Sequence, residues 1–474
     1  MIDLENLTIK KAHESLKNGE YTVTDLVNEY LKVIKEKNGE INAYLEVFND
    51  VLDQAKIAEE MFRNGTATLM TGIPMALKDN ILFEGHIASA SSKILENYKA
   101  TYDSFVVEKL KKEGVVFIGR TNMDEFAMGS STETSAYGNT RNPIDTTRVP
   151  GGSSGGSASA VRANMALVAL GTETCGSVRQ PASFCGLVGL KPTYGAVSRS
   201  GIIAMGSSLD QVGPLAKTVE EAETIFNIIN GFDKKDSTSI KDELRNIEKL
   251  PLKKRIGVPR EFLEGGGIDP DVLKNFNESC EKLKKAGYEI IDVSLPSIKY
   301  SLAVYYIVMP AEVSSNLARY DGIRYGLSVE GNNLLDVYMK SRGKGFGKEA
   351  RRRILLGTYI LSHGYYDAYY NTAVKVRKII KDELLGMYKE LNLDAFITPT
   401  VPFLPFKLGE KLNDPISMYL CDIFSAPANL ADLCSISVPS GYNKDGLPFG
   451  LQFTSPFLRE DILFTIGKDF EKLV

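Results

Sequence analysis

The chain has 474 residues, of which 43% are hydrophobic and 24% charged, and its net charge is −4. These values are ordinary for a globular protein. The slightly acidic balance argues against a general nucleic-acid or membrane-surface binder. Five scattered cysteines form no CxxC pair, which argues against structural zinc or a disulfide framework and predicts a reducing, cytoplasmic compartment. We expect neither a signal peptide nor a membrane span, because no apolar run reaches about 18 residues.

The first predicted element is a helix that begins after Thr22. Thr22 and Asp25 fit a capping box, in which each side chain satisfies a backbone N–H of the other residue. Apolar side chains follow at helical spacing, namely Val23, Leu26, Val27, Tyr30, Leu31 and Ile34. We expect this stripe to pack against the core, whereas a stripe that faced outward would be a docking surface for a partner.

From about residue 70, short β-rich runs alternate with helical runs. The predicted strands cover 115–118, 166–170, 255–258, 394–397, 435–438 and 447–453, with a turn at 443–446 joining the last two. This alternation predicts an α/β architecture with a mostly buried sheet. The segment 215–300 is rich in Lys and Glu, and we expect its helices to lie at the edge of the sheet. The segment 301–385 is also predicted to be helical.

The stretch 151–192 is the chemical centre of the sequence. It opens with GGSSGG, which includes Ser153, and returns to Gly176-Ser177. Glycines let the backbone approach a reacting carbon, and free N–H groups there can stabilise an oxyanion. None of the three histidines, His13, His86 and His363, lies near a Ser-rich turn, so a Ser-His-Asp triad is not expected.

Lys78 is a candidate base for a serine nucleophile. It ends the apolar run of GIPMALKDN, where loss of hydration favours the neutral amine. A lysine with a lowered pKa can replace histidine as the base. Taken singly, each signal has a plainer interpretation: Lys78 as a strand-end lysine that reaches solvent, and GGSSGG as a flexible linker.

Together these motifs resemble the amidase signature family. The resemblance rests on Lys78 in GIPMALKDN, Ser153 in PGGSSGGSASA and Ser177 in GTETCGSVRQPASFCGLVGLKPTYG, and it extends over nearly the whole chain. It implies an amidase-signature fold of the α/β class, with a large mixed central β-sheet covered by helices on both faces.

The resemblance also implies catalytic roles. Ser177 would be the nucleophile, Ser153 a bridging serine that follows a cis peptide, and Lys78 the base at the end of the proton relay. The oxyanion hole would consist of the backbone N–H groups of Thr174, Cys175, Gly176 and Ser177. No metal site is expected.

The same resemblance predicts a single amidase domain over 1–474. We expect an N-terminal helical region at 1–65, the catalytic motifs at 66–215 and a peripheral helical excursion at 216–300. The segment 301–474 would carry substrate-binding helices and then return to the sheet.

Motifs in the C-terminal half indicate which branch of the family the chain resembles. The runs RYDGIRYG at 319–326, GFGKEARRRILLGT at 345–358 and MYLCD at 418–422 resemble the glutamine-hydrolysing branch of the family, which serves tRNA-dependent amidotransferases. That resemblance implies that Arg353 holds the carboxylate of glutamine, Asp422 holds its ammonium group and Tyr305 assists. One fixed cation and one fixed anion suit a free amino acid.

The implied activity is glutamine hydrolysis that delivers ammonia to a partner. A larger subunit would bind misacylated Glu-tRNA(Gln) or Asp-tRNA(Asn) and use ATP with Mg²⁺, and a small third subunit would complete a heterotrimer. This chain has no GxxxxGK[ST] loop, so we expect it to bind no cofactor itself. The alternatives are a stand-alone amidase acting on simple amides, and a scaffold that has lost its chemistry.

Two positions depart from the Asp-Thr-Gly-Gly-Ser pattern of the family. Glu173 is longer than the usual aspartate, and Cys175 stands where a glycine is usual. A positive φ at Cys175 would cost about 1–3 kcal/mol and misplace the oxyanion hole. We favour a negative φ with a packed thiol, because residues other than glycine seldom adopt positive φ.

Overall fold

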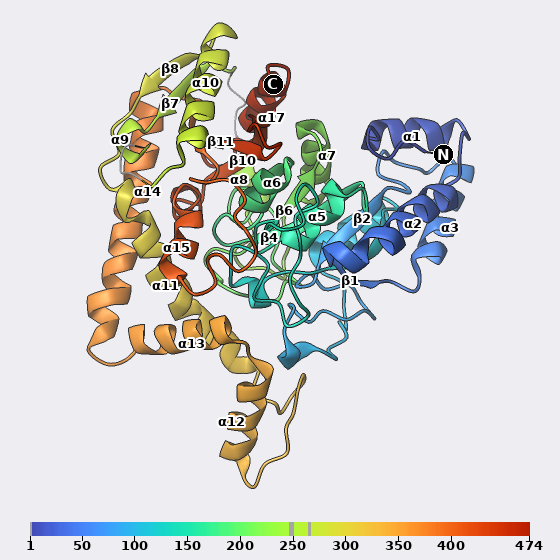
Figure 1. Cartoon of the computed structure of the whole chain (residues 1–474), viewed down its shortest axis with the longest axis horizontal. Coiled ribbons are helices and arrows are strands. Elements are labelled where there is room, and N and C mark those ends of the chain that lie inside the picture. The colour runs from blue at the N-terminus through green and yellow to red at the C-terminus, as the bar shows by residue number, and fades with distance from the viewer. Residues whose placement is uncertain (1, 246–250, 264–266) are drawn as a thin grey trace.

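The computed structural model describes residues 2–245, 251–263 and 267–474. Its strands join into one 11-stranded sheet in the order β1-β3-β2-β4-β6-β5-β10-β11-β9-β7-β8 (Figure 1). The strands are β1 Tyr44–Val47, β2 Pro74–Lys78, β3 Val116–Thr121, β4 Val168–Glu173, β5 Val188–Lys191, β6 Gln211–Ala216, β7 Arg255–Val258, β8 Glu289–Asp292, β9 Ala395–Pro399, β10 Cys434–Tyr442 and β11 Pro448–Ser455.

The sheet is mixed. β2 runs parallel to β3 and β4, and β7 runs parallel to β8 and β9, while the other neighbours are antiparallel. The predicted α/β class with a large mixed sheet is confirmed, and all six predicted strands overlap strands of the structure. The strands at the centre are fully buried, as expected for a sheet covered by helices.

Helices cover the sheet in two groups. α5 and α6 pack on each other and on β2, β4, β5, β10 and β11, whereas α7 and α17 pack on each other and on β5, β6, β10 and β11. The helices are α1 Ile9–Lys17, α2 Val23–Ile41, α3 Val51–Arg63, α4 Phe105–Lys112, α5 Gly155–Arg162, α6 Arg179–Cys185, α7 Val219–Ile229, α8 Asp242–Arg245, α9 Arg260–Leu263, α10 Pro270–Lys285, α11 Ser301–Asn316, α12 Leu334–Gly345, α13 Lys348–Ile360, α14 Thr372–Glu390, α15 Pro415–Tyr419, α16 Ala426–Leu430 and α17 Glu460–Glu471.

The predicted capping box starts α2. The Thr22 N–H donates to the Asp25 carboxylate at 2.9 Å, and the Asp25 N–H donates to the Thr22 hydroxyl at 3.0 Å. The apolar stripe packs into the core, with Val23, Leu26, Val27, Tyr30 and Ile34 buried. The alternative of an outward docking stripe is therefore wrong.

Strand direction brings the catalytic motifs together. β2 ends at Lys78 and β4 ends at Glu173. Because β2 and β4 are parallel, both ends lie at the same edge of the sheet. α5 packs on both strands, and Ser153 and Ser154 immediately precede it.

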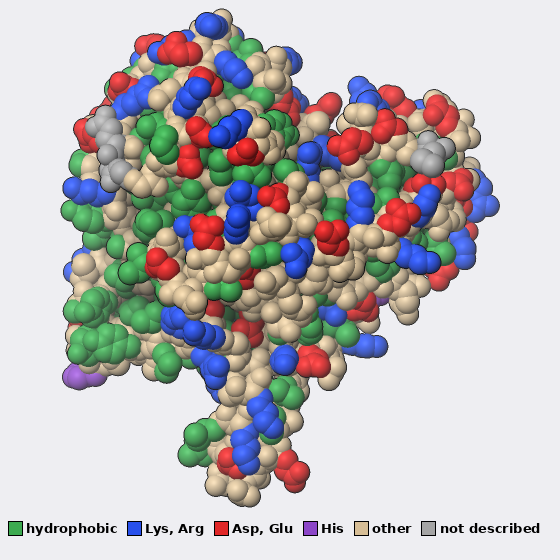
Figure 2. Space-filling model, viewed as in Figure 1, with side chains coloured by type: hydrophobic (Ala, Val, Ile, Leu, Met, Phe, Trp, Pro, Cys, Tyr) green, Lys and Arg blue, Asp and Glu red, His purple; other side chains and the backbone are tan. Residues whose placement is uncertain are grey.

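The C-terminal helices form a separate layer. α11 packs against α13 and α14. α12 projects from the body of the molecule, and Lys and Arg side chains are prominent over α12 and the neighbouring start of α13 (Figures 1 and 2). No helix in the described ranges is both long and apolar enough to cross a membrane.

Candidate active site

Lys78 is fully buried at the end of β2. Its Nζ donates to Ser153 Oγ at 2.7 Å, to Ser154 Oγ at 2.8 Å and to the Thr172 carbonyl at 3.0 Å. Burial lowers the pKa of Lys78 to about 7, although nearby carboxylates act in the opposite direction. The interpretation of Lys78 as a solvent-facing strand end is therefore wrong, and its amine is poised between its two protonation states at neutral pH.

The two serine segments meet beside this amine. The Gly152–Ser153 peptide is cis, as the family resemblance implies, and Ser153 and Ser154 are fully buried. The GGSSGG stretch is therefore no flexible linker. The Ser154 N–H donates to the Ser177 carbonyl at 3.2 Å, which joins the segments. Ser177 is 4% exposed, and its hydroxyl has no hydrogen-bond partner among the described residues.

A row of unpaired N–H groups precedes α6. Thr174, Cys175, Gly176 and Ser177 lie between the end of β4 and the start of α6. In the part of the chain that the structure describes, none of their four N–H groups donates a hydrogen bond. Gly176 has φ +72°, which a side chain would disfavour. Successive free donors of this kind are suited to stabilise an oxyanion.

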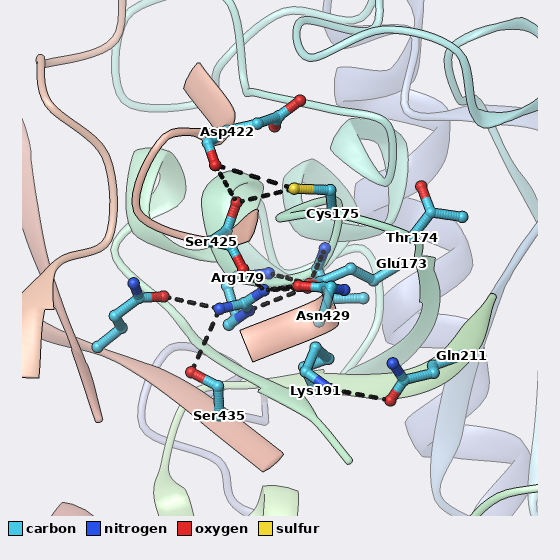
Figure 3. A network of polar contacts seen from close by, with 12 residues as sticks. Glu173, Thr174, Cys175, Arg179, Lys191, Gln211, Asp422, Ser425, Asn429 and Ser435 are labelled. Atoms are coloured by element: carbon cyan, nitrogen blue, oxygen red, sulfur yellow. Dashed lines mark hydrogen bonds and ion pairs between the residues drawn. The ribbon is translucent and has the colours of Figure 1, made fainter. Parts of the chain in front are cut away.

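Glu173 orders this loop despite its extra methylene. Its carboxylate accepts the N–H of Val178 at 3.0 Å and that of Arg179 at 3.2 Å. It also forms a buried ion pair with the Arg179 guanidinium (Figure 3). Burial alone would raise the pKa of Glu173, but Arg179 and the backbone donors bring it down to about 2. Arg179, which no sequence motif singled out, thus stabilises the loop by holding the carboxylate of Glu173.

Cys175 packs without backbone strain. Its φ is not positive, and the residue is 2% exposed. Its thiol lies 3.5 Å from Ser425 Oγ and 3.8 Å from the carbonyl oxygen of Asp422 (Figure 3). The expectation of a negative φ and a packed thiol is therefore confirmed.

A buried cation and a buried anion lie close to this loop. Arg353 on α13 is 3% exposed, and Asp422, in the short helix Leu420–Asp422, is 5% exposed. Tyr306 connects them: its hydroxyl donates to the Asp422 carboxylate at 2.7 Å, and its ring centroid lies 5.5 Å from the Arg353 guanidinium. Burial raises the pKa of Asp422 to about 7. The Arg353 Nε also donates to the Glu349 carboxylate at 2.8 Å, so the arrangement combines a partly paired guanidinium with the carboxyl group of Asp422.

Tyr305 faces the oxyanion loop instead. Its hydroxyl and that of Thr174 are hydrogen-bonded at 2.8 Å, so α11 contacts both the loop and Asp422. The family resemblance includes the pair Tyr305-Tyr306, and the predicted site took Tyr305 from it, whereas Tyr306 is the tyrosine that contacts Asp422. The sequence motifs did not single out Ser154, the second serine of GGSSGG, whose hydroxyl contacts Lys78.

The family of this chain follows from its similarity to known protein families. The family model described as "Amidase" matches residues 25–464. The chain belongs to the amidase family. Other amidase structures share its fold: one described as the crystal structure of an amidase is 27% identical, with a TM-score of 0.83 over 98% of this chain and 99% of its own.

More similar members of the amidase family carry a more specific name, that of the A subunit of glutamyl-tRNA(Gln) amidotransferase. The protein of that name from Thermoanaerobacter pseudethanolicus is 49% identical over 99% of this chain and 97% of its own length. Its namesake from Desulfatibacillum aliphaticivorans is 47% identical with the same coverage. The crystal structure of the namesake from Thermotoga maritima has a TM-score of 0.81 and 42% identity, covering 100% of this chain and 96% of its own.

Over the described residues, no group of three or more His, Cys, Asp or Glu side chains is arranged to hold a metal ion. All five cysteines are free and buried.

Proposed function

We propose that this chain is the glutaminase subunit of a tRNA-dependent amidotransferase. The observation that carries the proposal is the buried contact between Lys78 Nζ and Ser153 Oγ at 2.7 Å. The Ser154 N–H donates to the Ser177 carbonyl at 3.2 Å and so joins the segment of the nucleophile to this contact. The relatives named as the A subunit of glutamyl-tRNA(Gln) amidotransferase, which match almost the whole chain, support the choice of substrate.

The first half-reaction acylates Ser177. Neutral Lys78 accepts the proton of Ser153, Ser153 accepts the proton of Ser177, and Ser177 Oγ forms a bond to the amide carbon of glutamine. The negative charge that develops on the carbonyl oxygen is stabilised by the N–H groups of residues 174–177. When the tetrahedral intermediate collapses, the C–N bond breaks. The proton on Lys78 returns through Ser153 to the leaving nitrogen, which departs as ammonia.

The second half-reaction releases glutamate. A water molecule attacks the ester carbon and passes its proton through Ser153 to Lys78. The bond between that carbon and Ser177 Oγ then breaks, and the same proton returns to Ser177. The enzyme regains its starting protonation, so one glutamine and one water give one glutamate and one ammonia.

Arg353 and Asp422 select an α-amino acid. A guanidinium binds a carboxylate through two parallel hydrogen bonds, and an ionised carboxylate binds an ammonium group. Binding of the substrate ammonium favours the ionised form of Asp422, whose pKa burial has raised to about 7. Tyr306 holds the Asp422 carboxylate, and Tyr305 ties the same helix to the oxyanion loop at Thr174.

The ammonia would be consumed in a complex. We assign activation of the tRNA-bound glutamyl or aspartyl group, with ATP and Mg²⁺, to a larger partner subunit in the cytoplasm, with a small third subunit completing a heterotrimer. Because the relatives are named as one subunit of an amidotransferase, their name supports the existence of partner subunits. Exposed apolar side chains on α12 and α13, among them Met339 and Leu355, offer surface to such partners.

A stand-alone amidase is the second candidate, because an amidase structure shares this fold at 27% identity. The buried charges discriminate between the two. A hydrolase of neutral amides has no use for Arg353 and Asp422, which are expensive to bury. Co-expression with candidate partner subunits, followed by pull-down and a tRNA amidation assay with glutamine, tests the proposal. Hydrolysis of simple amides in preference to glutamine, with no amidation of tRNA, would support the second candidate.

A further inference from the structure

Three buried carboxylates act electrostatically on Lys78, namely Asp124, Asp210 and Glu173. Two of them have other partners. Glu173 forms an ion pair with Arg179, and Asp210 accepts the N–H of Met205 at 3.0 Å and feels the charge of Arg199. Asp124 has no ion pair in the described part of the chain, and Lys78 is the cation that acts on it. The negative charge of Asp124 also contributes to the raised pKa of Glu133 and to that of Cys421.

Asp124 organises the loop that holds the first serine motif. Its Oδ2 accepts the N–H of Thr132 at 2.9 Å and that of Ser131 at 3.3 Å. Its Oδ1 accepts the N–H of Thr134 at 3.2 Å and the Thr134 hydroxyl at 3.0 Å. Thr132, in turn, donates its hydroxyl to the Gly151 carbonyl at 2.8 Å and accepts the N–H of Gly155 at 3.1 Å. The loop therefore clamps both ends of the Gly-Gly-Ser-Ser-Gly segment.

The Asp124 carboxylate also lies directly against that segment. A Cβ atom on Gly152 would overlap Asp124 Oδ2 and lie 2.6 Å from the backbone nitrogen of Ser131, so glycine is required there. The backbone N–H of Asp124 donates to the Ser153 carbonyl at 3.3 Å. Asp124 is thus in contact with both residues of the peptide that presents the Ser153 hydroxyl to Lys78.

We propose that Asp124 is a positioning residue with two effects on the proton relay: it fixes Ser153 through the 131–134 loop, and its buried negative charge, held against the Gly152–Ser153 peptide, stabilises the ammonium form of Lys78. The proposal rests on the relay described under the proposed function. Burial raises the pKa of Asp124, whereas the hydrogen bonds from Thr132 and Thr134 and the charge of Lys78 act in the opposite direction and favour the carboxylate. A buried carboxylate stabilises the ammonium form of a nearby lysine, whereas burial of the lysine stabilises the amine. The balance keeps Lys78 able both to accept and to return a proton.

The direction in which the pKa of Lys78 changes follows from the negative charge of Asp124. If the charge of Asp124 is removed, the ammonium form of Lys78 loses stabilisation and its pKa falls. Ser177 then becomes reactive at lower pH, so the acidic limb of its pH profile moves down. A change that only loosens the loop would lower the rate at every pH and leave the midpoint of the limb in place.

The test measures the rate at which phenylmethylsulfonyl fluoride modifies Ser177, as a function of pH. This reaction needs the relay and no glutamine, so titration of Asp422 does not enter it. Asp124→Asn removes the charge and keeps an oxygen for the Thr132 N–H. Thr134→Val is the matched control, because it keeps the charge of Asp124 and removes a hydroxyl that organises the loop. That hydroxyl donates to Asp124 at 3.0 Å and to the Met128 carbonyl at 3.2 Å, and it accepts the Glu125 N–H at 2.9 Å. Thermal melting checks the fold, and Asp124→Ser replaces Asp124→Asn if the latter does not fold.

We expect the charge-removing variant to move the midpoint down by about one pH unit, and Thr134→Val to slow modification with the midpoint unchanged. A midpoint of the charge-removing variant equal to that of the wild type would overturn the proposal. If the wild type fails to hydrolyse glutamine but the midpoint still moves, the assignment of the substrate fails and the role of Asp124 stands.

Discussion

Lys78 Nζ lies 2.7 Å from Ser153 Oγ, and both side chains are fully buried. This contact places an amine with a lowered pKa against the hydroxyl that it is proposed to deprotonate. Because parallel strands β2 and β4 end at the same edge of the sheet, the fold itself brings Lys78 beside the loop that carries Ser177.

The first prediction concerns pH. For glutamine, kcat/KM should fall below about pH 7, because Lys78 must be neutral and Asp422 ionised, and the pKa of each is about 7. Lys78→Arg should lower kcat by about 10²–10⁴-fold, since a guanidinium does not deprotonate. Steady-state assays across the pH range check both. A flat profile, or an active arginine variant, would contradict the role of Lys78.

The second prediction concerns the oxyanion loop. Cys175→Gly should leave glutaminase activity within a few-fold of wild type, because the backbone already has a negative φ, and should lower stability by about 1–2 kcal/mol through lost burial and greater chain entropy. Kinetics and thermal melting measure the two effects.

Gly176→Ala is the matched comparison for that variant. Gly176 has φ +72°, and an added Cβ atom would lie 2.7 Å from Ser425 Oγ, so this substitution should abolish most activity. A large gain in rate from Cys175→Gly would show instead that the thiol handicaps the loop.

The third prediction separates glutamine from simple amides. Arg353→Ala should raise the KM for glutamine by about 10- to 100-fold, corresponding to a charged hydrogen-bonded contact of about 1.5–3 kcal/mol. Turnover of propionamide, which has no carboxylate, serves as the internal control and should change much less. An unchanged KM for glutamine would count against the amino-acid site.

The fourth prediction concerns the adjacent tyrosines. Tyr306→Phe removes the hydrogen bond to Asp422, which raises the pKa of that carboxyl further. The KM for glutamine should rise several-fold near pH 7 and return toward the wild-type value in alkaline buffer. Tyr305→Phe, whose lost contact is to Thr174, should show no such dependence on pH. Identical profiles for the two variants would refute the assignment.

The parts of the fold predictable from sequence are those encoded locally. The capping box of Thr22 and Asp25 and the alternating apolar runs each determine their own element. Strand β6 was not predicted, because Gly213 and Pro214 interrupt its sequence and proline usually argues against an interior strand. Its burial between β4 and β5 depends on tertiary packing, which no local pattern reveals.

The same limit applies to the site. Lys78, Ser153 and Ser177 stand in motifs that are distinctive in themselves. Tyr306, Ser154 and Arg179 gain their importance from partners far away in sequence: the Arg179 guanidinium, for example, also donates to Ser435 Oγ at 3.3 Å (Figure 3). Such contacts become visible only when the chain is folded.

The most direct test of the central claim is intact-protein and peptide mass spectrometry after the protein, with its partner subunits, is mixed with glutamine and quenched in acid. We predict a γ-glutamyl ester on Ser177 that is absent from Ser177→Ala and strongly reduced in Lys78→Ala. Glutamine hydrolysis that continues in Ser177→Ala, or an acyl group on a different residue, would contradict the account.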